Sequence, residues 1–328
     1  MRAIGIAGTA KNTGKTTSLN AILLAAADRG LRTAITSIGY DGEEFDHLTG
    51  LPKPRVTVTE GMLVATAVGT LRGATAGVER VGRTGVLTTL GEVVVVRVLQ
   101  PGLIPLAGPP TGAGVTVVVQ ALAEFGADLI LVDGAFGRMA PFAVLDGVIL
   151  ATGGARSRDI SRLAEETVAL AWMFSLPTLR PESAVVVENL LSESSAQRAL
   201  QQLERCAQLR VAGAVSRPAL DVLANWKGWE TGAACIFSDP IQLALAGDPV
   251  SVRGALQCLS KQAELGVLKP VQLKAVTINP FYPDAGAGAK GQFRPGFLDA
   301  EALYGAMART VPVPVVNVQI EGAARLIQ

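Results

Sequence analysis

The stretch "IAGTAKNTGKTTSLN", residues 6–20, ends an apolar run and opens a segment with helical spacing. Counted back from Lys15, residues 9–16 read Thr-Ala-Lys-Asn-Thr-Gly-Lys-Thr, the spacing G-x-x-x-x-G-K-[ST] with threonine in place of the first glycine. In such a loop, backbone N–H groups at the start of a helix surround phosphate oxygens. Lys15 adds positive charge for the outer phosphates, and the Thr16 hydroxyl can ligate Mg²⁺. The sequence therefore predicts a loop that binds nucleotide phosphates.

The segments around this loop have the order that the motif requires. Residues 2–7 form a short apolar run, residues 16–30 have helical spacing, and residues 32–39 return as a second strand. A strand, a crossover helix and a strand make a βαβ unit, so the two strands are parallel. The continuous apolar run at 129–133 is typical of a central parallel strand, and it ends at Asp133.

Carboxylates at the same edge of the sheet are the candidate metal ligands. The carboxyl ends of parallel strands meet at one edge, so Asp133 is expected to hold Mg²⁺ through water and Asp41 to face the γ-phosphate. A helix cap at Asp133 and a solvated turn at 41–44 are the alternative interpretations. The predicted catalytic residues are Lys15, Asp41 and Asp133, and the predicted metal site is Thr16, Asp41 and Asp133. The predicted nucleotide contacts are Thr9, Lys11, Asn12, Thr13, Gly14, Lys15, Thr16 and Thr17.

The rest of the chain continues as alternating strands and helices. This pattern predicts an α/β fold of the P-loop type, with a mostly parallel sheet and helices on both of its faces. A helix is expected at 59–74, and partly antiparallel strands at 79–107. Prolines at 177 and 181 favour a boundary between a nucleotide-binding domain, 1–178, and a C-terminal α/β region, 179–328.

Composition narrows the function classes. With 328 residues, 49% hydrophobic and 17% charged, the chain can bury one large core or a main domain with a companion. A net charge of +1 without a basic stripe argues against nucleic acid and membranes as partners. Three distant cysteines and one histidine support neither a disulfide framework nor a zinc site. Charges and prolines interrupt the apolar runs, so a cytoplasmic protein is expected.

Several other residues have a candidate functional role and an ordinary structural alternative. His47 has no identifiable Asp or Ser partner, which favours a structural role. Arg156, Arg158 and Arg138 are candidates to sense phosphate across an interface, although solvated arginines at such positions are common. The segment 279–293, with aromatic, Pro and Gly residues, suits a ligand or partner contact, or a surface excursion.

The loop has a family likeness. Residues 8–17, "GTAKNTGKTT", are similar to the GTxxxxGKT/S loop of dethiobiotin synthetase and of the cobyrinic and cobyric acid synthases, and "SIGYDGEEFD" resembles their "GPDYID" segment with Asp41 at the acidic position. These P-loop proteins belong to the SIMIBI class, which also contains the MinD/ParA and signal-recognition proteins. The resemblance implies Mg-ATP, and an ATP-dependent carboxylate-activating ligase. Members commonly pair across the nucleotide face, which implies a homodimer. The position of the signature lysine of MinD-type loops is occupied by Ala10 in this chain, and Lys11 follows one residue after that position.

A second resemblance extends over nearly the whole chain. The segments "AGTAKNTGKTT", "IGYDGE", "TGLPKPR", "DGAFGR", "DGVILATGG" and "TINPFYP" together resemble the P-loop subunit of the reactivating factor for lysine 5,6-aminomutase. This resemblance implies an ATPase that remodels a B12-dependent client enzyme, with a MutS-like subunit as partner. A client-coupled ATPase is therefore the main hypothesis and the ligase its alternative, because "DGEE" lacks the lysine that dethiobiotin synthetase carries near this strand end. A nucleotide-gated scaffold with negligible turnover is the third hypothesis.

Overall fold

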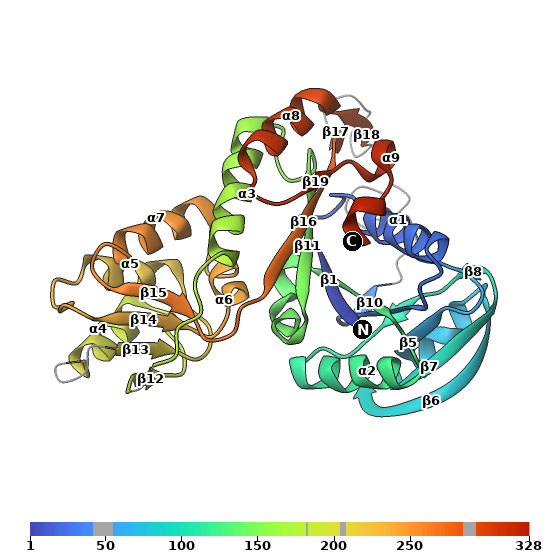
Figure 1. Ribbon diagram of the computed structural model, residues 1–328, viewed down its shortest axis with the longest axis horizontal. Helices are drawn as coiled ribbons and strands as arrows, with labels where there is room; N and C mark the ends of the chain where they lie inside the picture. Colours follow the sequence, from blue (N-terminus) through green and yellow to red (C-terminus); the bar gives the residue numbers. More distant parts are fainter. Residues whose placement is uncertain (42–54, 182, 204–207, 285–292, 328) are drawn as a thin grey trace. The chain divides into compact units, whose positions relative to one another are not determined.

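The computed structural model describes residues 1–41, 55–181, 183–203, 208–284 and 293–327, and the described chain forms two compact units (Figure 1). The first unit combines Met1–Leu163 with Leu273–Gln328, and the second is Ala164–Gln272. This division differs from the predicted boundary at 178. The chain leaves the first unit within helix α3 (Ile160–Phe174) and later returns to it, because strand β16 joins the sheet of the first unit.

A nine-stranded sheet forms the centre of the first unit, in the order β19-β16-β11-β1-β10-β2-β5-β7-β6. Strand β1 is parallel to β10 and β11, and β10-β2, β2-β5 and β16-β19 are parallel as well. Only β5-β7 and β7-β6 are described as antiparallel. The predicted α/β class with a mostly parallel sheet is confirmed. The strands are β1 Arg2–Gly8, β2 Thr33–Ser37, β5 Leu63–Ala67, β6 Gly77–Thr88, β7 Gly91–Gln100, β10 Leu129–Ala135, β11 Gly147–Gly153, β16 Gln272–Asn279 and β19 Val315–Val316.

Helices cover both faces of this sheet. Ile4 and Ile6 of β1 pack in one core with α1 (Lys15–Asp28) and the end of the chain. Side chains alternate between the faces of a strand, so Gly5 points the opposite way, where a Cβ would meet the Phe142 ring at 2.5 Å. Phe142 belongs to the turn η3, which contacts α2 (Gly112–Glu124). The sheet therefore lies between two helical layers.

The helix predicted over 59–74 is wrong. Leu63–Ala67 forms strand β5 and is buried at every position, and Val68–Gly73 follows as a 3₁₀ helix. A short apolar run that is covered on both faces has no alternation with polar residues. Its spacing therefore fits a buried strand as well as a helix, and the pairing of β5 with β2 and β7 decides between them.

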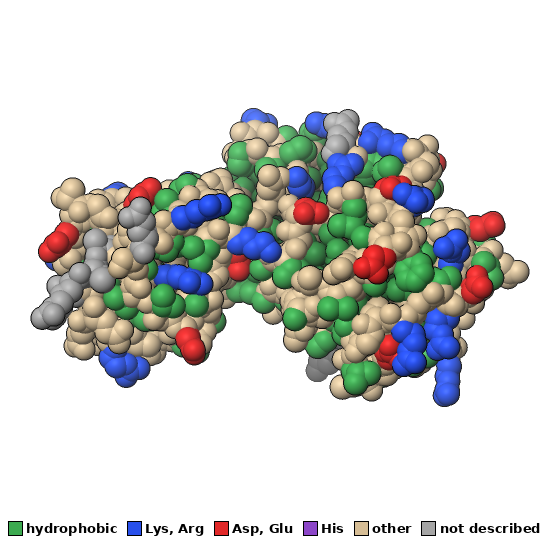
Figure 2. All heavy atoms as spheres, turned by 60° about the horizontal axis from the view of Figure 1, so that its bottom comes forward, with side chains coloured by type: hydrophobic (Ala, Val, Ile, Leu, Met, Phe, Trp, Pro, Cys, Tyr) green, Lys and Arg blue, Asp and Glu red, His purple; other side chains and the backbone are tan. Residues whose placement is uncertain are grey.

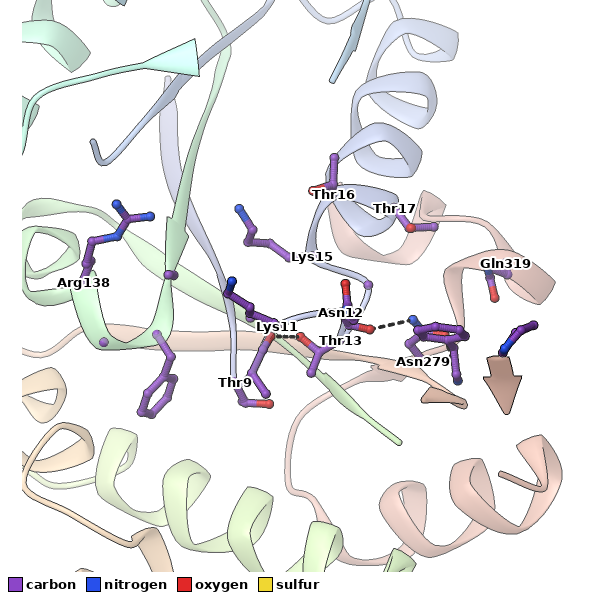
Figure 3. Close-up of a pocket in the computed structure, with 18 of the residues that line it drawn as sticks. Thr9, Lys11, Asn12, Thr13, Lys15, Thr16, Thr17, Arg138, Asn279 and Gln319 are labelled. Atoms are coloured by element: carbon purple, nitrogen blue, oxygen red, sulfur yellow. Dashed lines mark hydrogen bonds between the residues drawn. The ribbon is translucent and has the colours of Figure 1, made fainter. Parts of the chain in front are cut away.

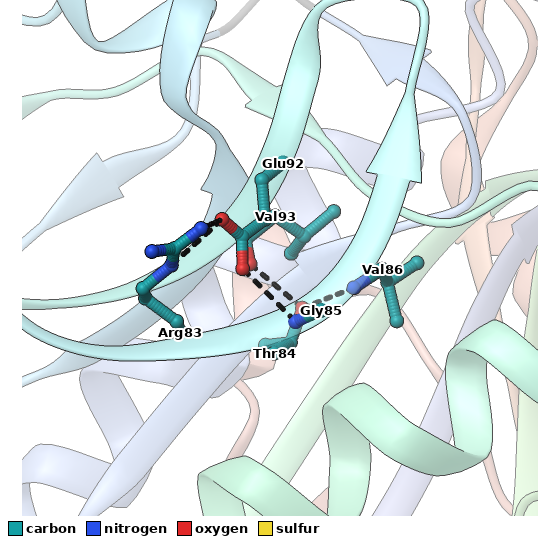
Figure 4. A network of polar contacts seen from close by, with 6 residues as sticks. All are labelled: Arg83, Thr84, Gly85, Val86, Glu92 and Val93. Atoms are coloured by element: carbon teal, nitrogen blue, oxygen red, sulfur yellow. Dashed lines mark hydrogen bonds and ion pairs between the residues drawn. The ribbon is translucent and has the colours of Figure 1, made fainter.

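The predicted antiparallel pairing within 79–107 is confirmed by the hairpin β6–β7 (Figure 4). Its register shifts between Arg83 and Leu87, where extra residues are accommodated. Glu92 Oε1 accepts a hydrogen bond from the Gly85 N–H at 3.0 Å, while Arg83 Nη2 donates to Glu92 Oε2 at 2.6 Å. Thr84 Oγ1 donates to the Val93 carbonyl at 2.7 Å. These contacts fix the bulge.

The second unit is built on a parallel four-stranded sheet in the order β12-β13-β14-β15. Its apolar core includes Phe237 and Leu209 from the strands and Leu220 from a helix. Trp226 and Trp229 pack against this core with their rings edge to face, 5.1 Å apart. The elements are β12 Val185–Val187, α4 Glu193–Gln201, β13 Gln208–Val211, α5 Arg217–Asn225, β14 Ala234–Phe237, α6 Pro240–Ala244, α7 Pro249–Leu259 and β15 Glu264–Val267.

Short elements complete the first unit. On the face in Figure 2, basic and acidic side chains are interspersed, in agreement with the net charge of +1.

None of the helices in the described ranges is both long and apolar enough to cross a membrane. The remaining elements are β3 Tyr40–Asp41, β4 Thr57–Val58, η1 Val68–Gly73, β8 Gly102–Leu103, β9 Leu106–Ala107, η2 Phe136–Arg138, η3 Ala140–Val144, β17 Phe281–Asp284, β18 Arg294–Phe297, α8 Ala300–Thr310, α9 Val318–Glu321 and η4 Ala324–Ile327.

Candidate functional site

The predicted phosphate loop connects β1 to α1, as its spacing requires. Gly14 is the residue before the helix and has φ 85°, a conformation that glycine adopts without strain. A Cβ at Gly14 would lie 3.0 Å from Cβ of Asn279, so the position also has little space for a side chain. No side chain caps the helix and its first turn has no acidic residue. The first N–H groups of α1 are therefore suited to an anion.

The contacts of Gly8 and Thr9 explain why the motif can have a threonine in place of its first glycine. A Cβ at Gly8 would lie 2.9 Å from Thr13 Oγ1, so the close approach depends on Gly8. The buried Thr13 hydroxyl donates to the Ala10 carbonyl at 3.0 Å and closes the turn. The Thr9 N–H donates to the Ala151 carbonyl of β11 at 2.9 Å. Glycine is thus required at position 8, and Thr9 anchors the loop to the neighbouring strand.

The lysine of the loop lies beside the predicted metal carboxylate. Lys15 Nζ is 2.5 Å from Asp133 Oδ2, and the two side chains are 16% and 2% exposed. β1 and β10 are adjacent parallel strands, with Ile6 paired to Asp133, which brings the end of β10 to the base of the loop. The sequence prediction that Asp133 lies at the phosphate edge is consistent with this arrangement. The ion pair therefore links the lysine of the loop to strand β10.

A pocket of about 670 Å³ opens over the loop (Figure 3). All eight predicted nucleotide contacts line the pocket. Ala10, which lies between two of them in the sequence, lines it as well. Lys11, Lys15 and Arg138 lie on one side of the loop, and Asn279 and Gln319 on the other. The further lining residues are Gly8, Tyr40, Ala135, Phe136, Gly137, Phe281, Pro295 and Phe297.

The chain offers hard oxygen ligands for Mg²⁺ at this place. Thr16 lines the pocket, and the buried Asp133 carboxylate, which is not itself among the lining residues, lies beside the lining residue Lys15. Mg²⁺ is commonly held by one or two protein oxygens together with substrate phosphates and water, so these residues fit the ion. Among the described residues there is no group of three or more His, Cys, Asp or Glu that can hold a metal. The backbone of Asp41 pairs with Leu106 in β3–β9, and its side chain lies outside the described residues.

The other side of the pocket comes from the segment that begins at Asn279 and from Gln319, for which the sequence predicted no role. Asn279, at the end of β16, donates from Nδ2 to the carbonyl of Asn12 at 3.3 Å. Asn12 has φ 64°, so this bond supports a residue in a strained conformation. Phe281 and Phe297 meet edge to face, 5.9 Å apart, and Gln319 comes from α9. The sequence of 279–293 suits a ligand or partner contact, or a surface excursion, and its residues Asn279 and Phe281 line the pocket, whereas 285–292 lie outside the described residues. An asparagine at the end of a predicted strand is the sequence signal for this contact.

The three candidate arginines and His47 differ in their position relative to the pocket. Arg138 lines the pocket. Arg158 does not: it pairs with Asp284 at 3.2 Å and lies over the Tyr282 ring at 4.5 Å, so it braces the hairpin β17–β18. Arg156 is also outside the pocket lining. His47, together with 42–54 as a whole, lies outside the described residues.

Comparison with protein-family models and with curated proteins found no match. Among solved structures, the chain is similar to one described as "Structure of pNOB8 ParA bound to nonspecific DNA", with a TM-score of 0.29 and 11% sequence identity. The alignment covers 80% of this chain and 98% of that chain.

Proposed function

We propose that this protein binds and hydrolyses ATP with Mg²⁺ and couples the hydrolysis to the remodelling of a client enzyme. The observation that carries the nucleotide part is the β1–loop–α1 junction, where Gly14 opens the helix and Lys15 lies 2.5 Å from Asp133. Backbone N–H groups, one lysine, one hydroxyl and one carboxylate around a pocket are the parts that phosphoryl transfer needs.

Each residue has a distinct task in this proposal. The first N–H groups of α1 and the Lys15 ammonium bind the phosphates, and the Thr16 hydroxyl and Asp133 carboxylate hold the metal, Asp133 through water. When bound, Mg²⁺ supplies charge neutralisation at the transferred phosphoryl group. Asp41 is the proposed residue near the γ-phosphate. Asn279, Phe281 and Gln319 offer amide groups and an aromatic ring for the nucleoside, which suits a base but does not select adenine over guanine.

The client-coupled role rests on the sequence resemblance to the aminomutase reactivase. It is supported by the division of the chain, because none of the described residues of the second unit, Ala164–Gln272, belongs to the pocket lining. A unit that is not needed for the nucleotide is available for a protein partner. The proposed partners are a MutS-like subunit and a B12-dependent aminomutase, with Lys11 as the residue that reaches a second copy if the protein forms a homodimer.

The experiment measures Mg²⁺-dependent ADP release by the full chain, alone and with the MutS-like subunit and aminomutase added. Slow release that accelerates with the partners supports the proposal. Release that instead requires a small carboxylate and an amine, in step with product, supports the ligase. Lys15→Met is expected to abolish release, whereas Lys227→Met, an exposed lysine of the second unit with the same charge change, is expected to leave it intact. Absence of ATP and GTP binding by the wild type refutes the nucleotide part.

A further inference from the structure

Arg138 is a cationic pocket residue without a task in the proposed chemistry. It ends the 3₁₀ turn η2, directly after the strand that carries Asp133, and its side chain is exposed. Within the described part of the chain its guanidinium forms no ion pair, whereas Arg158 pairs with Asp284 and Lys15 with Asp133. Arginine has several N–H donors in a planar fork and no acceptor. An anionic ligand can therefore bind there without displacing a protein partner.

The backbone beneath this guanidinium is fixed. A Cβ built on Gly39 would lie 3.2 Å from Arg138 Nη1, so the side chain lies against a glycine. Gly39 has φ 68°, and its carbonyl accepts hydrogen bonds from Ser37 Oγ at 2.7 Å and from the Gly108 N–H at 3.1 Å. A rigid glycine at this point leaves room for the guanidinium at the pocket wall. The Arg138 guanidinium therefore lies against the Gly39 backbone, in space that a side chain at position 39 would fill.

The pocket is chemically different at its two sides, and this difference gives the direction of a bound nucleotide. Asn279 and Gln319 lie on one side of the loop and offer amide groups to a nucleoside. Aromatic rings that can contact a base line the pocket at Phe281 and Phe297, and also at Tyr40 and Phe136. Lys15 and Arg138 lie on the other side (Figure 3). Phosphates that lie over the loop therefore extend towards Arg138, and the terminal phosphate is the group that comes nearest to it.

We infer that Arg138 binds the terminal phosphate of a nucleoside triphosphate and so makes the pocket discriminate triphosphate from diphosphate. The inference rests on the proposed nucleotide site and adds a specificity residue to it. A guanidinium binds phosphate oxygens through two parallel hydrogen bonds, which a diphosphate bound in the same register does not offer at this position. Lysine keeps the charge but lacks the fork, so it replaces arginine only in part.

The test is a set of calorimetric titrations of the full chain with Mg²⁺, using ADP and the non-hydrolysable β,γ-imido analogue of ATP. Arg138→Ala is expected to weaken binding of the triphosphate analogue about 10- to 100-fold and that of ADP less than about twofold. Arg138→Lys is expected to fall between the wild type and Arg138→Ala. Arg309→Ala, which removes an exposed arginine outside the pocket lining, is the charge control and is expected to change neither affinity.

The outcomes separate the inference from the proposed function. Equal losses for both ligands after Arg138→Ala, or no loss, overturn the inference while the nucleotide site stands. A wild type that binds neither ligand overturns the nucleotide site itself. Thermal melting of each variant, together with its ADP affinity, shows whether the pocket is intact. A variant that melts with the wild type, keeps ADP and loses the triphosphate supports the assignment.

Discussion

Replacement of Lys15 is expected to damage the fold as well as the activity. Lys15 Nζ lies 2.5 Å from a carboxylate that is only 2% exposed, and the lysine side chain itself is 16% exposed. Removing one member of a buried ion pair leaves the other charge in a poorly solvated place, which costs about 3–5 kcal/mol. For a unit of this size, each kcal/mol lowers the melting temperature by about 2–4 °C. Lys15→Met is therefore expected to lower the melting temperature by about 6–20 °C.

The double variant Lys15→Met/Asp133→Asn separates stability from function. It removes both charges, so most of the lost stability is expected to return, to within about 1.5 kcal/mol of the wild type, while nucleotide binding stays absent. All three tryptophans, Trp172, Trp226 and Trp229, belong to the second unit, so their fluorescence reports that unit. Circular dichroism reports the whole chain. A loss in the first unit is expected to move the dichroism transition more than the fluorescence transition.

Two results would refute this reasoning. If Lys15→Met melts with the wild type, the carboxylate of Asp133 does not depend on the lysine for its stabilisation. If the double variant melts below the single variant, the destabilisation does not come from an uncompensated charge. Lys227→Met is the control, because it removes an exposed lysine and is expected to melt like the wild type.

Three further predictions test particular contacts. Asn279→Ala removes the hydrogen bond to the Asn12 carbonyl, which contributes a free energy of about 1 kcal/mol. The variant is therefore expected to bind nucleotide about fivefold more weakly in a titration. Unchanged affinity would contradict the role of Asn279 in supporting the loop. Burial raises the pKa of Asp239, so the charged form of this side chain is disfavoured in the folded state. Asp239→Asn should therefore melt above the wild type at pH 7, and the difference in melting temperature should shrink as the pH falls towards about 4. A melting temperature below that of the wild type at pH 7 would argue against this. Burial raises the pKa of Cys235 to about 12, whereas Cys258 is exposed. In a variant whose remaining cysteine, Cys206, is replaced by serine, a thiol reagent at pH 8 should therefore label Cys258 and not Cys235. Rapid labelling of both thiols would show that the core around Cys235 opens.

Local sequence determined the phosphate loop. The run at 2–7, Gly14 and Lys15 are close together in the chain, and their spacing specifies a strand, a left-handed glycine and a helix start without distant residues. The strand that carries Asp133 was equally readable, because a continuous apolar run is typical of a central parallel strand. Adjacency of these two strands then brings Lys15 to Asp133.

Other features were decided only by tertiary structure. The segment at 63–67 reads as helix in isolation and becomes a strand because it is paired on both edges. Asn279 reaches the loop because β16 lies two places from β1 in the sheet, and Arg138 reaches the pocket through the backbone space left by Gly39. The order of strands and the close approach of distant backbones arise when the whole sheet packs, and periodicity along the chain carries no record of either. The sequence by itself thus specified the loop that is proposed to bind phosphate, whereas the tertiary structure decided which other residues line the pocket.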